Sequence, residues 1–400
     1  MPDNHDLILD RQFVMTEGRK GRVDRIRDLY TTFNPEVDLE ALKRDGYMEA
    51  VGEMMEPITM SFDDRSPEVL AYWAKRGMVK EFHGDLDAFS WAEYERKTGY
   101  RWEMPADAVQ NRFRRWNSFV PVSAFAPENK GRKYPVVIVL HGGFNPISIV
   151  DGWGYPQEAA KREWIVIAPS IELDDVLDEI LAEAAALYPI DESRIYITGF
   201  SYGGFMCNTI AGKRPDVYAA AAPCGAPLDS GFVDRAIGPE PQTPFDGRAR
   251  SVDLGTYMPI MAVSGNLDGH RFPVFAYRDP RTGENRAEAL LEGINHWARA
   301  NGAGEFRPED VLGLKDRSDL SEEEKHLGLP LAPECRRTIT ADGITNYIAD
   351  LPSADGVVRT RLMCEMNMPH WPTPEMVRQI FAFFSHFSRD RKTGRSIYTE

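Results

Sequence analysis

The spacing of hydrophobic residues changes near residue 113 and divides the chain into two predicted regions. The first region has apolar residues at helical intervals, for example at Val23, Ile26, Leu29, Tyr30 and Phe33. The second has short runs that are apolar on both faces, and these alternate with helical segments. Such runs are typical of strands in a parallel sheet that is covered on both sides. We therefore expect a mainly helical extension over residues 1–112 and an α/β domain over residues 113–392.

Five apolar runs predict the strands of this sheet. They cover residues 134–140, 164–168, 195–198, 218–222 and 259–263, and weaker strand patterns follow at 344–348 and 357–363. Helical patterns occupy residues 174–187, residues 285–301 and the stretch that begins at Thr373-Pro374. Alternating strands and helices favour right-handed crossovers, which put helices on both faces of a mostly parallel sheet. A polar stretch predicts an insertion at about residues 303–343.

The extension carries one clear helix start. Ser66, Pro67 and Glu68 have the order of a cap, a first-turn proline and an acid, and the helix they open is expected to end near Gly77. The extension has no catalytic spacing. We expect it to cap the main domain, to mediate homo-oligomerisation, or to do both.

Ser201 is the candidate nucleophile. It lies between a strand pattern and a helix pattern, with Gly199 and Gly203 on either side. A turn this tight strains the backbone of the serine and leaves no room for side chains at the two glycine positions. The helix that follows directs its first N–H groups at the same point, where they can stabilise an oxyanion. The five-residue pattern is weak alone, and the flanking strand and helix give it weight.

The candidate acid is Asp268. It follows the apolar run 259–263 directly, at the carboxyl end of a predicted strand that comes after Ser201. An acid there can orient an imidazole beside the nucleophile. Asp174 and Asp175 come before Ser201 in the chain and are weaker candidates.

The candidate base is His370. It lies late in the chain, in a loop after a strand pattern, and Pro369 and Pro372 stiffen that loop. His270 is the runner-up, because it is two residues from Asp268, although the other reading makes it a surface loop residue. The remaining histidines lie on predicted helices, in the extension or in loops.

A glycine-rich loop follows the predicted strand 134–140. It reads His141-Gly142-Gly143-Phe144, and its glycines let backbone N–H groups approach a substrate oxygen closely. The expected oxyanion-hole donors are the amide of Tyr202 and that of Gly143 or Phe144. His141 itself is expected to be a structural loop residue.

These segments together resemble the α/β-hydrolase fold and, within it, the group of polyhydroxybutyrate depolymerases and feruloyl esterases. The resemblance covers about residues 115–390 and is carried by residues 198–206, 215–225, 265–268, 295–302 and 370–372. It implies a serine esterase with Ser201, Asp268 and His370 as the catalytic triad. The loop after Asp268 is longer than is usual in that group, and the acidic residues at the start of the sequence predict no signal peptide. Both features favour a small soluble ester over a polymer.

The substrate pocket is expected to contain Trp153, Tyr155 and Trp371, with Tyr202 and Phe144 nearby. These side chains favour an aromatic or apolar group on the substrate. Three alternatives stay open: a serine peptidase of the same fold that acts on amides, an acyltransferase, and a non-catalytic scaffold that binds a ligand.

Composition restricts the partners and the compartment. The net charge of −15 argues against nucleic acid and anionic membranes as partners, because both attract clustered Lys and Arg. No apolar stretch reaches the roughly 20 residues that cross a bilayer. The four cysteines lack C-x-x-C spacing and predict free thiols, with Cys207 and Cys224 filling the core. With an acidic N-terminus, this favours the cytoplasm. No metal-ligand spacing occurs, so we expect neither a metal nor a cofactor.

Overall fold

The structure is a computed structural model of the full chain. It describes residues 67–84, 116–142, 147–170, 174–228, 256–279, 282–341 and 343–400. The helical pattern predicted at residues 23–33 lies outside the described residues, and so do Gly143 and Phe144 of the glycine-rich loop.

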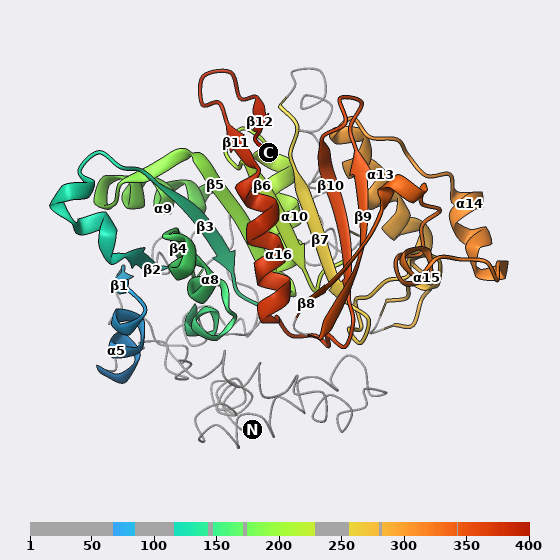
Figure 1. The fold of residues 1–400 in the computed structure, drawn as a ribbon, viewed down its shortest axis with the longest axis horizontal. Coiled ribbons are helices and arrows are strands. Elements are labelled where there is room, and N and C mark those ends of the chain that lie inside the picture. Colours follow the sequence, from blue (N-terminus) through green and yellow to red (C-terminus); the bar gives the residue numbers. More distant parts are fainter. Residues whose placement is uncertain are drawn as a thin grey trace, which may run out of the picture.

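A ten-stranded sheet runs through the domain in the order β1-β2-β4-β3-β5-β6-β7-β10-β9-β8 (Figure 1). The central strands are parallel: β4 (Ile165–Pro169), β3 (Tyr134–Leu140), β5 (Ile190–Phe200), β6 (Ala220–Cys224), β7 (Ile260–Gly265) and β10 (Val358–Glu365). The edge strands are antiparallel: β1 (Met78–His83), β2 (Trp116–Pro121), β9 (Ile344–Pro352) and β8 (Arg336–Ala341). The mostly parallel sheet is as predicted.

Helices cover both faces of the sheet (Figure 1). One face carries α9 (Asp174–Leu187), α10 (Tyr202–Lys213) and α13 (Ala287–Ala300), and the other carries α8 (Tyr155–Arg162) and α16 (Pro374–Ser385). The strand β3 shows why continuous apolar runs predict the central strands of this sheet. Its Val136 and Ile138 pack in the first core and its Val137 and Val139 in the second, so every residue of the strand is buried.

Several predicted elements are confirmed. The patterns at residues 174–187 and 285–301 are α9 and α13, and the last helix is α16. The helix predicted after Ser66 is α5 (Pro67–Lys75), and Gly77 follows it with a φ of 72°. This angle suits glycine and ends the helix.

The predicted domain boundary at residue 112 does not separate the extension from the sheet. Residues 78–83 form β1, which pairs with β2 from Met78↔Pro121 to His83↔Trp116. The predicted insertion behaves similarly: α14 (Pro308–Gly313) and α15 (Glu322–Leu327) lead into β8, which pairs with β9. Both strands lie at sheet edges and are only partly buried, so their sequences carry weak alternation, and pairing with a neighbour decides their conformation.

The short elements complete the fold. A hairpin of β11 (Phe387–Arg389) and β12 (Ser396–Tyr398) ends the chain. Single 3₁₀ turns occur at η2 (Val122–Phe125), η3 (Pro127–Asn129), η4 (Ile147–Gly152), η5 (Val274–Ala276), η6 (Leu314–Asp316) and η7 (Pro333–Cys335).

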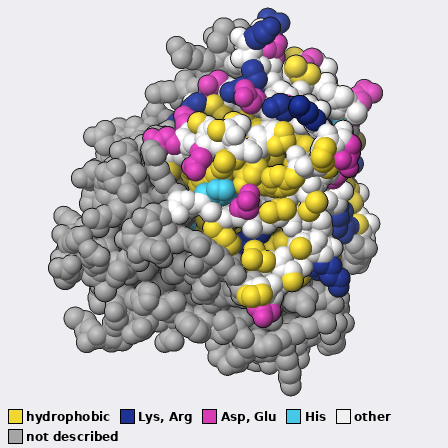
Figure 2. Space-filling view, turned by 90° about the vertical axis from the view of Figure 1, so that its left-hand side faces the viewer, with side chains coloured by type: hydrophobic (Ala, Val, Ile, Leu, Met, Phe, Trp, Pro, Cys, Tyr) yellow, Lys and Arg dark blue, Asp and Glu magenta, His cyan; other side chains and the backbone are white. Residues whose placement is uncertain are grey.

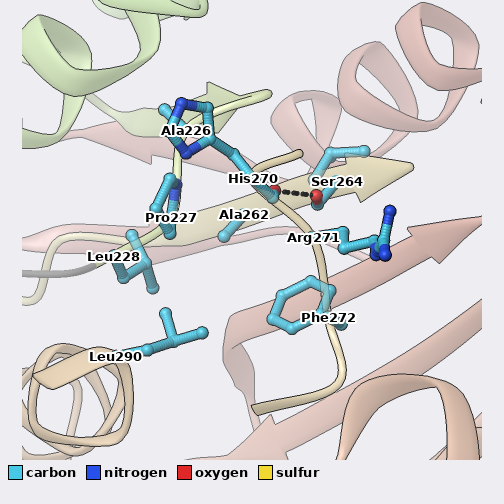
Figure 3. A pocket seen from close by; sticks show the side chains of 10 residues that line it. Ala226, Pro227, Leu228, Ala262, Ser264, His270, Arg271, Phe272 and Leu290 are labelled. Carbon is cyan, nitrogen blue, oxygen red and sulfur yellow. Dashed lines mark hydrogen bonds between the residues drawn. The ribbon is translucent and has the colours of Figure 1, made fainter. Parts of the chain in front are cut away.

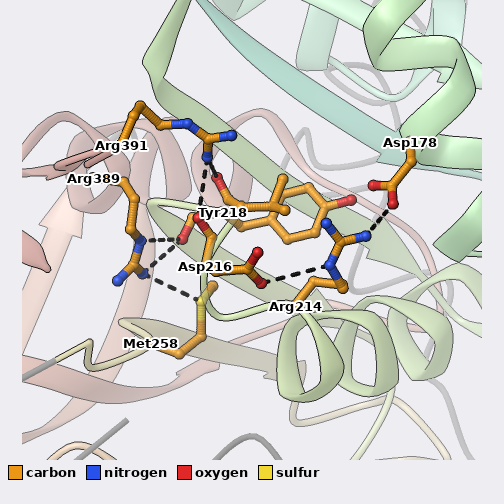
Figure 4. A network of polar contacts seen from close by, with 8 residues as sticks. Asp178, Arg214, Asp216, Tyr218, Met258, Arg389 and Arg391 are labelled. Atoms are coloured by element: carbon orange, nitrogen blue, oxygen red, sulfur yellow. Dashed lines mark hydrogen bonds and ion pairs between the residues drawn. The ribbon is translucent and has the colours of Figure 1, made fainter. Parts of the chain in front are cut away.

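A buried arginine fastens the C-terminal hairpin to the amino ends of β6 and β7 (Figure 4). Arg389 donates to the carbonyl of Tyr218 at 2.7 and 3.1 Å and to that of Tyr257 at 2.9 Å. It also donates to the carbonyls of Thr256 and Gly394. The guanidinium is therefore satisfied by backbone oxygens, at the end of the sheet opposite the carboxyl ends of the parallel strands.

The side of the domain that carries α9 and η2 exposes apolar side chains among charged ones (Figure 2). Val122, Phe125 and Leu187 are each about half exposed, and the ring of Phe125 meets that of Tyr188 edge-on. Scattered apolar residues of this kind are common on protein surfaces. Homo-oligomerisation therefore stays a prediction.

All four cysteines lie in the described part of the chain and carry free thiols. Cys207 and Cys224 are buried, which confirms their predicted place in the core. Within the described residues, no helix combines the length and the apolar character that spanning a bilayer requires.

Candidate active site

Ser201 occupies a strained turn between β5 and α10. Its φ of 57° and ψ of −120° are unusual for a residue with a side chain. The Ser201 N–H donates to the carbonyl of Cys224 on β6 at 2.9 Å, and its own carbonyl accepts from the N–H of Phe205 at 3.1 Å. Both backbone groups of the serine are thus held by neighbouring elements, and the predicted strand, turn and helix are confirmed.

Glycines around Ser201 let the backbones meet directly. A Cβ at Gly199 would lie 2.4 Å from the Gly203 oxygen, and one at Gly203 would lie 2.3 Å from the Leu140 oxygen. A Cβ at Gly204 would lie 2.5 Å from the Cys224 oxygen. The start of α10 therefore rests on the ends of β3 and β6, and any side chain at these positions would push the turn away.

Asp268 and His370 meet at the ends of two adjacent parallel strands, β7 and β10. The Nδ1 atom of His370 lies 2.9 and 3.0 Å from the two carboxylate oxygens of Asp268, although the residues are 102 positions apart. Asp268 is completely buried and His370 is 8% exposed. The structure thus brings together the two residues that the sequence suggested as acid and base.

The charge state of Asp268 follows from these contacts. Burial acts to raise the pKa of Asp268, but the charge and hydrogen bond of His370 and the N–H of His270 outweigh it. The pKa of Asp268 therefore lies below its ordinary value, and the carboxylate is ionised at neutral pH. An ionised Asp268 accepts a hydrogen bond from the Nδ1–H of His370, and in this tautomer the lone pair of the imidazole is on Nε2.

The His370 imidazole also lies beside the serine turn. Its ring centre is 5.0 Å from that of Phe200, the residue immediately before Ser201. Ser201, Asp268 and His370 follow the carboxyl ends of β5, β7 and β10 respectively. This is the edge of a parallel sheet at which sites are expected.

The loops that carry Asp268 and His370 are hydrogen-bonded to each other. The N–H of Asn367 donates to the Asn266 side chain at 2.6 Å, and the N–H of Leu267 donates to the Met368 carbonyl at 3.2 Å. A Cβ at Gly265 would lie 1.8 Å from the Met368 oxygen. The two loops therefore pack as one unit.

The predicted oxyanion hole is partly described. Tyr202 is the first residue of α10, so its N–H lies at the helix N-terminus next to Ser201. The second predicted donors, Gly143 and Phe144, lie outside the described residues. His141 has its ring nitrogens 2.8 and 3.3 Å from the carbonyls of Gly142 and Ser170, and burial lowers its pKa. A neutral, anchored His141 agrees with its predicted structural role.

Comparison with known proteins points to the same fold. A model of the prolyl oligopeptidase family matches residues 169–234, which include the serine turn. Poly(3-hydroxyalkanoate) depolymerase C of Paucimonas lemoignei is 25% identical over 136 residues, which is 27% of this chain and 33% of that protein. Feruloyl esterase B of Thermothelomyces thermophilus is 30% identical over 142 residues, which is 30% of this chain and 47% of that protein. The chain has the α/β-hydrolase fold.

The chain spans about a third to a half of the length of these curated relatives. Among solved structures, the acetyl xylan esterase from Aspergillus awamori has 12% identity and a TM-score of 0.39, covering 68% of this chain and 93% of that one. The Staphylococcus aureus serine hydrolase FphF has 17% identity and a TM-score of 0.37, covering 48% of this chain and 83% of that one.

Two of the predicted pocket residues, Trp153 and Trp371, are buried and pack next to the serine turn. The rings of Trp153 and Trp371 meet nearly at right angles at 6.1 Å, and Trp153 also lies 5.8 Å from Phe200. Tyr155 differs, because its hydroxyl accepts from Thr198 and donates to the Cys224 sulfur inside the core. The contacts of Tyr155 are structural, and the substrate-binding role of all three residues stays a prediction.

His270 departs from the expectation of a surface loop residue. It is 3% exposed, its N–H donates to Asp268 at 2.8 Å, and its ring centre lies 5.8 Å from that of His370. Its side chain lines a small pocket with Arg271, Phe272, Leu228 and Leu290 (Figure 3). The Ser264 hydroxyl donates to the His270 carbonyl at the edge of this pocket. Residues 268–270 form a turn in which the backbone of His270 contacts the Asp268 side chain. The hydrophobic pattern of the sequence does not indicate this turn.

A buried ion pair links β1 to η4. Lys80 of β1 donates to Asp151 of η4 at 2.7 Å, and both side chains are fully buried. The Trp73 indole of α5 donates to the same carboxylate oxygen at 2.9 Å. This link is not visible in the sequence, because neither residue has a spacing that indicates a partner so far along the chain.

Proposed function

We propose that this chain is a serine esterase that hydrolyses a carboxylic ester through an acyl-enzyme intermediate. Ser201 is the nucleophile, His370 the general base and Asp268 the residue that orients the imidazole. The observation that carries the proposal is the buried His370–Asp268 hydrogen bond beside the strained turn of Ser201. This combination of nucleophile, base and orienting acid is the requirement for an activated serine.

The reaction follows from these positions. His370 takes the proton of Ser201 Oγ through Nε2 as Oγ bonds to the ester carbonyl carbon, and the carbonyl oxygen becomes an oxyanion. The Tyr202 N–H donates to that oxyanion, with Gly143 or Phe144 as the predicted second donor. When the intermediate collapses, the alkoxide leaves with the proton from His370. Water then attacks the acyl carbon while His370 takes a proton from it. When this second intermediate collapses, the bond between Oγ and the acyl carbon breaks, His370 returns the proton to Ser201 Oγ, and the acid product leaves.

Esters are the favoured substrates. Both curated relatives are named for ester-cleaving activities, and an ester needs less assistance to expel its leaving group than an amide does. Trp153 and Trp371 pack next to the serine turn, and such apolar surroundings favour an aromatic or apolar group next to the carbonyl. The proposed partner is therefore a small-molecule ester with such a group.

A serine peptidase is the second candidate, because the family model that matches residues 169–234 is that of the prolyl oligopeptidases. Rates on a p-nitrophenyl ester and on an aminoacyl anilide with the same acyl group separate the two functions. Faster turnover of the anilide would overturn the esterase proposal.

Replacing the nucleophile tests the proposal most directly. We expect Ser201→Ala to lower kcat on a p-nitrophenyl ester by about 10⁶-fold, the scale seen when a catalytic serine is removed. The wild-type protein should react with a fluorophosphonate and Ser201→Ala should not. Ser385→Ala, at an exposed position on α16, is the matched control and should react normally. A wild-type protein that neither reacts nor hydrolyses esters would favour the non-catalytic scaffold.

A further inference from the structure

Glu365 lies at the base of the loop that carries His370. It is the last residue of β10, and its side chain is fully buried. Its Oε1 accepts a hydrogen bond of 2.5 Å from the hydroxyl of Thr373. Thr373 is also fully buried and caps α16 by accepting from the N–H of Met376 at 3.0 Å. One hydrogen bond therefore joins the two ends of the loop that spans residues 366–372.

The other oxygen of Glu365 is buried, and within the described part of the chain it has no hydrogen-bond partner. A carboxylate in this position would carry a poorly solvated charge, which costs several kcal/mol, whereas a protonated carboxyl would not. The packing thus favours the neutral acid.

The charged and titratable neighbours of Glu365 do not reverse this preference. On α16, Glu375 lies nearby and is itself paired with Arg378 at 2.6 Å. The other titratable neighbours are buried thiols, Cys364 on β10 and Cys224 on β6. Burial is the main cause that raises the pKa of Glu365 to about 8, and Glu375 adds to it, while Thr373 and Arg378 act against it.

We propose that Glu365 is a positioning residue for His370: it ties the His370 loop to the start of α16, and its neutral form keeps water out of the base of that loop. The inference rests on the proposed function for its effect on catalysis. Hydrogen bonds to Asn266 and Leu267 hold one side of this loop, and the Glu365–Thr373 bond closes its base. Ionisation of Glu365 keeps the bond from Thr373 but places a charge on the unpartnered oxygen. The water that this charge draws into the base of the loop loosens its packing and moves His370 away from Asp268.

The first test is the pH dependence of catalysis. Wild-type kcat should fall above about pH 8, to about a tenth at pH 9.0, because a single ionisation removes the active form. Glu365→Gln keeps an acceptor for Thr373 and cannot ionise, so its ratio of kcat at pH 9.0 to kcat at pH 7.0 should stay near one. KM should change little, since the loop positions the base. Glu334→Gln, at an exposed position, is the control and should keep the wild-type ratio. Rates on Ser201→Ala provide the blank.

Thr373 variants test the other partner of the bond. Thr373→Val removes the hydroxyl that both donates to Glu365 and caps α16. We therefore expect kcat to fall about tenfold at pH 7.0, the scale of one lost hydrogen bond, and Thr373→Ser to restore it. The same alkaline fall in Glu365→Gln as in the wild type would overturn the inference, and so would a wild-type kcat in Thr373→Val.

Hydrogen exchange of residues 366–373, expressed as protection factors, separates this inference from the proposed function. Protection should fall above pH 8 in the wild type but not in Glu365→Gln. Unfolding provides a matching readout. The pKa of Glu365 is raised in the folded state, so wild-type stability should decrease as pH rises from about 4.5 to about 8, and Glu365→Gln should lack this decrease. If the wild type proves inactive on esters, these two measurements still decide whether Glu365 holds the loop.

Discussion

The two halves of the candidate site are built in different ways. The serine half, around Ser201, comes from one continuous stretch of strand, turn and helix with glycines at the contact points. The histidine half joins two loops whose key residues are 102 positions apart, and it is held by hydrogen bonds between those loops. Local sequence can therefore specify a strained turn. The contact between an imidazole and its carboxylate depends instead on how the strands that precede them are paired.

Among variants that keep Ser201, the largest expected effect is on the histidine half. Asp268→Asn should lower kcat by about 10⁴-fold on a p-nitrophenyl ester, because an amide at this position favours the wrong tautomer of the imidazole. Asp319→Asn, an exposed residue of the insertion, is the control and should keep wild-type kcat. If Asp268→Asn keeps more than a tenth of wild-type kcat, the carboxylate does not orient His370.

A smaller effect, on stability, is expected at the ion pair between β1 and η4. Lys80→Met leaves the buried carboxylate of Asp151 without its cation and should lower the free energy of unfolding by about 3–5 kcal/mol. Chemical denaturation measures this change. The double variant Lys80→Met with Asp151→Leu removes both charges and should regain most of the loss. An unchanged midpoint in Lys80→Met would show that β1 does not anchor η4.

The glycine contacts allow the two halves to be compared directly. Gly203→Ala would place a Cβ 2.3 Å from the carbonyl oxygen of Leu140. Gly265→Ala would place one 1.8 Å from the carbonyl oxygen of Met368. Each should lower the free energy of unfolding by about 1–3 kcal/mol, the usual cost of overpacking. Gly304→Ala meets nothing within 4 Å and is the matched control.

Fluorophosphonate reaction then distinguishes the halves. Gly203→Ala should slow the reaction by displacing the serine, and Gly265→Ala should slow it by moving the base. Because a higher pH replaces a missing base in part, raising the pH should recover the rate more in Gly265→Ala than in Gly203→Ala. Equal recovery would remove the distinction between the two halves.

The central part of the fold could be predicted from the sequence because its strands are buried on both faces. The run at residues 134–140 became β3 without change, and residues 174–187 became α9. The edge strands β1 and β8 could not be predicted, since each is stabilised mainly by pairing with a neighbour that lies elsewhere in the chain. Their residues alternate weakly between polar and apolar, which matches loops and helices equally well.

The candidate site shows the same division. The order of Ser201, Asp268 and His370 along predicted elements was enough to select these residues. The buried position of His270 and the Glu365–Thr373 bond were not predictable, because both depend on how the loops after β7 and β10 fold back on each other. Nothing in a run of residues such as Glu365–Thr373 indicates that its two ends meet.

The sheet core, the helices that cover it and the strained turn at Ser201 could all be predicted from the sequence. These features depend on hydrophobic periodicity and on glycines, both of which act over a few neighbouring residues. Three features became visible only in the folded chain: the pairing of the edge strands, the ion pair between Lys80 and Asp151, and the hydrogen bond between His370 and Asp268. Those features form where distant segments pair and bury polar groups. Their contribution to the free energy of folding depends on how much water is lost and how well the hydrogen bonds are aligned.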